Sequence, residues 1–279
     1  RSLQRRPQAP HAKSKFLAIY AHQWGATTIP YTGQAYDHNH PQHRQAHQHL
    51  TQSAALRSLM LLSGPNGIGK SRLLGHWRDQ LDTRHYIPIA ITQASLSHAG
   101  LLSYLSRKLG KPSGTRSTNL MHLEEALAEH HDKTTVIILD EAQNDNHAAL
   151  EEIRLLLGID LRLAGDDYLL GALKLRSHRS LYTRIACHYH LEPWTPEQLT
   201  QLLEVSHQAI GLNHSLLDTG AQDLIISASN GLPRTALQLA QAAWIKASQD
   251  KATQITAEHV QSIIGTIPAV SEGQRPPLT

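Results

Sequence analysis

One eight-residue segment of the chain has the composition of a phosphate-binding loop. Its residues are Gly64, Pro65, Asn66, Gly67, Ile68, Gly69, Lys70 and Ser71. A backbone that wraps around a phosphate needs many inward N–H groups and φ/ψ values that glycine reaches at low cost. Lys70 would place a point charge between the outer phosphates, and the Ser71 hydroxyl would reach Mg²⁺. This GxxxxGK[ST] pattern predicts a binding site for ATP, and we add Arg72 to the expected contacts.

Two adjacent carboxylates provide the second chemical signal. Asp140 and Glu141 directly follow the apolar run Val136–Leu139. If this strand lay beside the strand of the loop, Asp140 would hold Mg²⁺ through water. Glu141 would then polarise the water that attacks the terminal phosphate. The alternative is a strand that ends in solvated acids, but the phosphate loop favours a catalytic pair and therefore hydrolysis.

These residues must be positioned by strands and helices that alternate along the first two thirds of the chain. We expect strands at Ser58–Ser63, Tyr86–Thr92, Thr134–Leu139 and Leu161–Ala164. We expect helices around Pro41–Arg57 and at Lys70–Leu81, Leu101–Leu109, Leu120–His131 and Ala148–Leu157. The strands lack period-2 polarity, which indicates a parallel sheet covered by helices on both faces.

The pattern changes from Thr195 onward. The segments Pro196–Gln208, Ser215–Ser229, Leu232–Ser248 and Ala257–Ile264 all have helical spacing, with no convincing strand among them. The predicted organisation is a flexible basic arm at 1–15, an α/β domain with an N-terminal lead-in at 16–193, a small helical domain at 194–266 and a flexible tail at 267–279. The four tryptophans are expected to pack in the interior.

Composition narrows the class of protein further. With 40% hydrophobic residues, most of the chain is expected to fold. The net charge of +3 is compatible with a polyanionic partner but does not require one. Cys187 is the only cysteine, and no apolar run is long enough to cross a bilayer. We therefore expect a cytoplasmic protein with no membrane partner.

Taken with two later segments, the loop and the acidic strand end resemble those of AAA+ ATPases. The later segments are the apolar strand and turn Leu161–Leu169 and the turn Ser229–Arg234, which is similar to the s-x-G-x-P-R motif of that family. The resemblance implies a P-loop α/β fold followed by an all-helical lid. It covers residues 28–266, including the aromatic-then-histidine lead-in, and is most similar to the ExeA/TniB/TnsC/MuB-like group.

The resemblance also assigns roles to single residues. Asp166 occupies the position called sensor 1, where the family more often has Asn, Gln or His. Arg234 would be sensor 2, an arginine whose planar fork can pair with two phosphate oxygens. Arg184 would be an arginine finger offered to the ATP of a neighbouring subunit, with Arg179 as the reserve. ATP would then lie at subunit junctions.

The function implied is that of a nucleotide-switched regulator. We expect an ATP- and Mg²⁺-dependent homo-oligomer, as a ring or a filament, on double-stranded DNA. It would recruit or activate a transposase or another recombination or target-selection protein, and hydrolysis would drive disassembly. Lysine and arginine residues of the initial arm are candidate DNA contacts. The alternatives are a helicase loader, a secretion-associated ExeA-like ATPase and a nucleotide-gated interaction protein with negligible hydrolysis.

A cluster of histidines lies between residues 38 and 49. Its members are His38, His40, His43, His47 and His49. His43 and His47 are four residues apart, so on a helix they share one face and could bind Zn²⁺. Because no cysteine or second cluster accompanies them, we interpret the segment as the solvated start of a helix.

Overall fold

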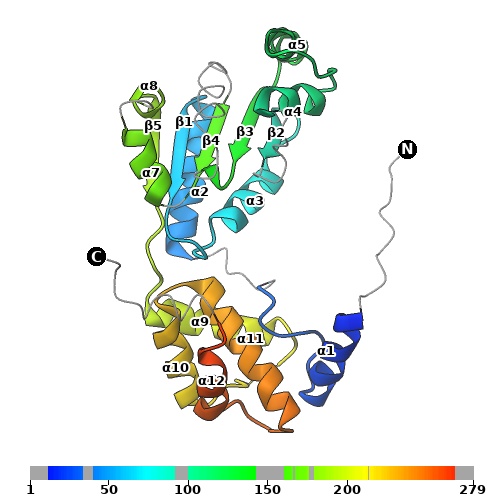
Figure 1. Ribbon diagram of the computed structural model, residues 1–279, viewed down its shortest axis with the longest axis vertical. Coiled ribbons are helices and arrows are strands. Elements are labelled where there is room, and N and C mark those ends of the chain that lie inside the picture. Colours follow the sequence, from blue (N-terminus) through cyan, green and yellow to red (C-terminus); the bar gives the residue numbers. More distant parts are fainter. Residues whose placement is uncertain are drawn as a thin grey trace. The chain divides into compact units, whose positions relative to one another are not determined.

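The computed structural model divides the chain into two compact units (Figure 1). One contains residues 38–192 and is called here the α/β unit; the other contains residues 1–37 and 193–279 and is called the helical unit. The structure describes residues 12–33, 40–91, 100–142, 160–165, 167–175, 179–212 and 214–267. The predicted helix Ala148–Leu157, His38, Asp166 and most of the predicted arm and tail lie outside these residues.

A five-stranded parallel sheet forms the centre of the α/β unit, which confirms the predicted fold class. Its strands are β1 (Leu59–Ser63), β2 (Tyr86–Ile91), β3 (Thr134–Leu139), β4 (Asp160–Ala164) and β5 (Ile185–His190). Their spatial order is β2-β3-β4-β1-β5. The sequence did not predict β5, and the expectation that β3 lies beside β1 is wrong because β4 is hydrogen-bonded between them.

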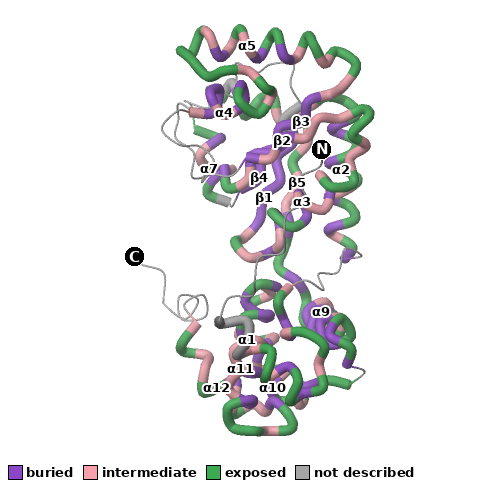
Figure 2. Tube along the Cα trace, turned by 90° about the vertical axis from the view of Figure 1, so that its right-hand side faces the viewer, coloured by how far each residue is buried: buried purple, intermediate pink, exposed green. Residues whose placement is uncertain are grey.

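Helices cover both faces of this sheet. They are α2 (Pro41–Ala55), α3 (Lys70–Gln80), α4 (Gly100–Lys108), α5 (Arg116–Glu129), α7 (Asp167–Lys174) and α8 (Arg179–Tyr182). On one face, Leu61, Ile137 and Leu163 form a buried core with leucines of α4 and α7. On the other, the Arg162 guanidinium of β4 lies 5.5 Å from the centre of the Trp77 ring of α3. The central strands β1, β3 and β4 are correspondingly among the most buried segments (Figure 2).

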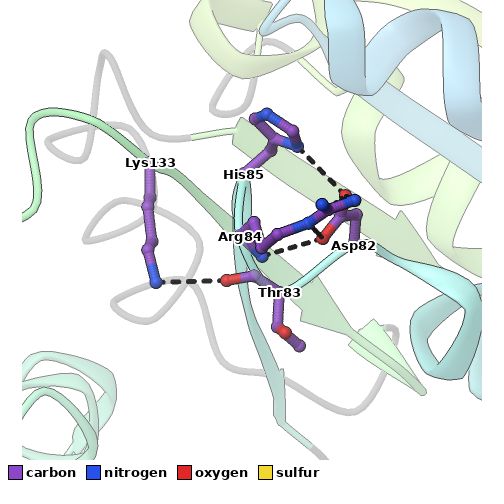
Figure 3. Close-up of polar contacts among 5 residues, drawn as sticks. All are labelled: Asp82, Thr83, Arg84, His85 and Lys133. Atoms are coloured by element: carbon purple, nitrogen blue, oxygen red, sulfur yellow. Dashed lines mark hydrogen bonds and ion pairs between the residues drawn. The ribbon is translucent and has the colours of Figure 1, made fainter.

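A small polar cluster holds the start of β2 (Figure 3). The Asp82 carboxylate accepts hydrogen bonds from the backbone N–H of Arg84, at 2.9 Å, and from its guanidinium, and it also lies 3.2 Å from the His85 ring nitrogen. The Arg84 contacts lower the pKa of Asp82 to about 2. Lys133 donates to the Thr83 carbonyl at 3.1 Å, which ties the turn before β3 to the turn before β2. This cluster supports the amino ends of the strands.

The helical unit contains α1 (Ala12–Gln23), α9 (Pro196–Gln208), α10 (Thr219–Ser229), α11 (Pro233–Gln249) and α12 (Ala257–Ile264). The segment 12–33, expected to be a lead-in to the α/β domain, packs against these helices. Trp24 donates a hydrogen bond to Ser248 at 2.7 Å, and the Tyr20 and Trp244 rings meet edge to face. All four tryptophans are buried, as predicted.

Candidate nucleotide-binding site

The glycine-rich segment forms the turn between β1 and α3 (Figure 1). Gly64, Gly67 and Gly69 have φ values of +147°, +89° and +113°. A Cβ atom on Gly64 would lie 2.6 Å from the carbonyl oxygen of Leu191, closer than real Cβ contacts allow. Positive φ and close backbone approach therefore explain why glycine is needed here. Ile68 is fully buried and anchors the turn in the interior.

The Lys70 side chain folds back across this turn. Its ammonium group donates hydrogen bonds to the carbonyl oxygens of Gly64, at 2.7 Å, and Pro65, at 3.1 Å. Lys70 is only 7% exposed. A buried cation needs polar partners, and the two loop carbonyls supply them. The loop therefore holds a positive charge where the phosphates of a nucleotide are expected.

The first turn of α3 has an unusual beginning. Its N-cap is Gly69 in a left-handed conformation, and no side chain of the described residues caps the helix. The first N–H groups of an α-helix have no intrahelical acceptor, and the helix dipole places partial positive charge there. Ser71 and Arg72 follow in this turn and are exposed. An uncapped helix start fits an anion.

Asp140 and Glu141 end β3 at the same edge of the sheet. Leu139 is in register with Leu163, which is in register with Leu61 of β1. The end of β3 therefore lies two strand spacings, roughly 10 Å, from Leu61, which is two residues before the end of β1. Both the acidic pair and the phosphate loop therefore follow the carboxyl ends of strands of the same parallel sheet.

The acidic pair has a defined local geometry. The Asp140 carboxylate accepts the N–H of Glu141 at 3.0 Å, and the Asp140 N–H donates to the Ile91 carbonyl at 3.0 Å. Glu141 has a φ of +56° and is exposed. Left-handed backbone at a non-glycine residue is uncommon and turns the chain sharply after β3. The two carboxylates thus differ: Asp140 is partly buried and hydrogen-bonded, whereas Glu141 is presented to solvent.

The predicted arginine finger lies at the other edge of the sheet. Arg184 is exposed in the turn between α8 and β5, and the following residue, Ile185, pairs with Leu59 at the start of β1. Because β1 and β5 are parallel, Arg184 is at the amino edge, whereas the phosphate loop follows the carboxyl edge. This arrangement does not bring Arg184 to the loop of its own chain. Arg179, the reserve, is exposed at the start of α8.

The structure describes only one of the two predicted sensor residues. Asp166 lies outside the described residues, although the preceding Gly165 donates to the Leu62 carbonyl at 3.1 Å. Arg234 is exposed in the first turn of α11, in the helical unit. A Cβ on Gly231 would lie 2.7 Å from Pro193 Cβ, and Gly231 has a φ of +76°. The turn before Arg234 therefore requires glycine, as its motif predicts.

Two of the histidines expected to be solvated, His40 and His43, are buried, whereas His47 and His49 are partly exposed. His40 and His43 are 4% and 1% exposed, and their ring centres are 5.0 Å apart. Burial lowers the pKa of His43 to about 4, so this ring is neutral at pH 7. Among the described residues, no group of three or more His, Cys, Asp or Glu side chains is arranged to hold a metal ion. The two rings therefore belong to the packing around the start of α2.

A polar contact directly before the loop was not predicted. Ser63, the last residue of β1, is fully buried and hydrogen-bonded to His188 and His190 of β5. His188 and His190 are two residues apart in the sequence. Their contact with Ser63 could be inferred only once residues 185–190 are known to form the strand beside β1.

Comparisons with known proteins support the AAA+ fold that the sequence predicted. Residues 54–172 match the family model described as an AAA domain. The fold is similar to the Aeropyrum pernix ORC2 protein in its ADPNP-ADP complexes, with 18% identity, a TM-score of 0.62, and coverage of 86% of this chain and 71% of that one. The Aeropyrum pernix ORC1 protein in complex with DNA matches with 18% identity, a TM-score of 0.61, and coverage of 92% and 69%.

A third structure is the Thermotoga maritima RuvB Holliday junction branch migration motor, with 18% identity, a TM-score of 0.53, and coverage of 80% and 68%. No curated protein sequence matches the chain. At these identities the structural likeness shows the fold alone, and it agrees with the match of residues 54–172 to the AAA domain model. The AAA domain, together with this fold, indicates an ATPase. Within the described part of the chain, no helix combines the length and the apolar character needed to cross a membrane.

Proposed function

We propose that this protein is an ATP- and Mg²⁺-dependent AAA+ regulator that assembles on double-stranded DNA and recruits or activates a transposase or similar recombination partner. The observation that carries the proposal is the phosphate loop itself. Its glycines with positive φ, the buried Lys70 ammonium and the uncapped start of α3 all favour a polyphosphate, and Asp140 and Glu141 end a strand at the same edge of the sheet.

Each residue of the site has one task in this proposal. The loop from Gly64 to Ser71 binds the phosphates, and Lys70 moves from the loop carbonyls to the outer phosphates. Ser71 and Asp140 are suited to hold Mg²⁺, which usually keeps several waters and takes few protein ligands. Mg²⁺ supplies charge neutralisation on the phosphate oxygens when bound. Glu141, exposed and turned outward, orients and deprotonates the attacking water.

Arg184 makes hydrolysis dependent on assembly. Its place at the edge of the sheet remote from its own loop suits a role on the ATP of a second copy. Arg234, on the helical unit, would respond to the presence of the γ-phosphate. ATP binding would thus favour assembly, and hydrolysis would release it.

A mixing experiment tests the shared site. Arg184→Ala and Glu141→Gln should each lose ATPase activity alone. A mixture should regain part of it, because an intact Glu141 on one subunit can meet an intact Arg184 on the next. Arg179→Ala serves as the control and should remain active. A mixture as inactive as its components would contradict a finger acting between subunits.

Association with DNA is supported by the fold neighbours, one of which is described in complex with DNA and another as a Holliday junction motor. The test is a mobility shift with duplex DNA in ATP, ADP and no nucleotide, with negative-stain microscopy of the same samples. We expect binding and assembly with ATP, weakening steeply with salt because the contacts are to phosphates. If no duplex is bound in an ATP-dependent way, the transposition role fails while the ATPase assignment stands.

A further inference from the structure

The buried hydroxyl of Ser63 joins the phosphate loop to the last strand of the sheet. Its oxygen lies 2.8 Å from Nε2 of His188 and 2.7 Å from Nδ1 of His190. A serine hydroxyl has one proton and two lone pairs. Ser63 can therefore donate to one ring and accept from the other. The arrangement therefore fixes the hydroxyl between two side chains of β5.

The backbone strengthens the same connection. The N–H of Leu191 donates to the Ser63 carbonyl at 2.9 Å, and the Leu191 carbonyl leaves no room for a side chain on Gly64. Gly64 in turn accepts the Lys70 ammonium at 2.7 Å. A displacement of the Ser63–Gly64 peptide would consequently move the carbonyl on which Lys70 rests.

The strand that contacts Ser63 also leads out of the α/β unit. The Glu192 N–H donates to the Gln42 side chain at 2.8 Å, and Gln42 donates back to the Glu192 carbonyl at 3.3 Å. The His190 ring lies 3.8 Å from the Glu192 carboxylate. The point where the chain leaves this unit is therefore clamped to the start of α2, near where the chain enters it.

Beyond Glu192, the same segment contacts the turn that precedes Arg234. The N–H of Trp194 donates to the Gly231 carbonyl at 2.8 Å, and Pro193 and Trp194 occupy the space that a side chain on Gly231 would need. The seven residues His188–Trp194 thus contact the start of the phosphate loop at one end and the Gly231 turn at the other.

We propose that Ser63 is a positioning residue, which sets the phosphate loop through His188 and His190 and links nucleotide binding to the segment His188–Trp194. The inference rests on the proposed binding of ATP by the loop. Ser63 itself is buried beneath the loop and acts through Gly64 and Lys70.

The test compares two buried serines of the α/β unit. Ser63→Ala removes the bridge; Ser106→Ala, also fully buried, removes a hydroxyl that bonds the Leu102 and Asn119 carbonyls instead. The affinity for a fluorescent ATP analogue and the melting temperature are measured for both. We expect both variants to lose some thermal stability, but only Ser63→Ala to bind nucleotide about fivefold to tenfold more weakly, because the two hydrogen bonds that hold the start of the loop to β5 are lost.

Two further variants separate positioning from folding. Ser63→Thr keeps the hydroxyl and should bind within about twofold of the wild type. His190→Ala, at a partly exposed position, should weaken binding on its own, and the double variant Ser63→Ala/His190→Ala should be no weaker than the worse single variant. If Ser63→Ala does not fold, the His190→Ala measurement still decides the question.

The outcomes distinguish this inference from the proposed function. A wild-type protein that binds no ATP would overturn both. A wild-type protein that binds ATP, while Ser63→Ala and His190→Ala bind it equally well, would overturn the role of Ser63 alone. The same holds if Ser106→Ala weakens binding as much as Ser63→Ala does.

Discussion

Two helices of the helical unit, α9 and α10, begin differently from α3, the helix after the phosphate loop. Thr195 and Gln198 form a reciprocal capping box at α9, and the Asp218 carboxylate accepts the Ala221 N–H at 2.6 Å at α10. At α3 the corresponding residue is Gly69, which offers no side chain. The starts of α2 and α11 also lack a side-chain cap among the described residues, but each has a proline in its first turn, which removes one of the N–H groups that a cap would serve. The start of α3 has neither a cap from the described residues nor a proline, so its N–H groups are available to a ligand.

The largest expected effect concerns the chemistry at this site. Glu141→Gln should lower ATP turnover by roughly 10²- to 10⁴-fold, because the amide cannot take a proton from water. Binding of ATP should persist, since the phosphate loop is unchanged. The measurement is phosphate release alongside equilibrium binding. Normal turnover in this variant would show that another group activates the water.

The next effect concerns the glycine geometry of the loop. Gly64→Ala should destabilise the α/β unit by roughly 2–4 kcal/mol and abolish tight nucleotide binding, because its Cβ meets the Leu191 carbonyl at 2.6 Å. Gly75→Ala is the matched control, since this glycine lies within α3 with no atom within 4 Å of the new Cβ. That variant should stabilise the protein by about 0.5–1 kcal/mol. Thermal unfolding with and without ATP measures stability and binding for both variants. A Gly64→Ala protein as stable as the wild type, and equally stabilised by ATP, would contradict the need for glycine at position 64.

Each unit also contains one buried histidine whose pKa is lowered to about 4, His43 in the α/β unit and His207 in the helical unit. The main cause in both cases is desolvation, and the His207 ring is hydrogen-bonded to the Tyr31 hydroxyl at 2.5 Å. A lowered folded-state pKa means that the unfolded chain binds the proton first. The free energy of unfolding should therefore fall as pH falls from about 6.5 to about 4, by up to about 3 kcal/mol for each histidine.

Hydrogen exchange can follow the two units separately. His207→Gln should flatten the pH dependence of the helical unit and leave that of the α/β unit, and His43→Gln should do the reverse. A pH profile that neither variant changes would mean that these rings are already protonated, or solvated, in the folded protein.

The smallest expected effect concerns α9, a helix whose start is capped by its own side chains. Thr195→Ala should destabilise the helical unit by about 1 kcal/mol, because the Gln198 N–H at the start of α9 loses the hydroxyl oxygen that accepts it. Affinity for ATP should not change. Calorimetric unfolding and nucleotide titration of the same sample give both quantities, and weaker ATP binding would mean that this cap is not purely structural.

The sequence predicted those features that local chemistry determines. The glycine spacing identified the loop, and continuous apolar runs identified β1 and β3. The sequence did not identify β5, because polar side chains interrupt the apolar ones in residues 185–190. This strand lies at the edge of the sheet and is only partly buried. The position of β4 between β1 and β3 depends on tertiary contacts, which no local sequence pattern encodes. The burial of His40 and His43, and the packing of the segment 12–33 on the helical unit, likewise depend on contacts between distant residues.

Calorimetric titration of the full chain with ATP and Mg²⁺ tests the central claim most directly. The comparison variants are Lys70→Ala and Lys108→Ala, the latter removing an equal charge from an exposed position on the same unit. We predict one ATP per chain for the wild type and for Lys108→Ala, and at least a tenfold loss of affinity for Lys70→Ala, corresponding to about 1.4 kcal/mol or more. Absence of binding by the wild type, or equal binding by all three proteins, would contradict the assignment of residues 64–71 as the phosphate site.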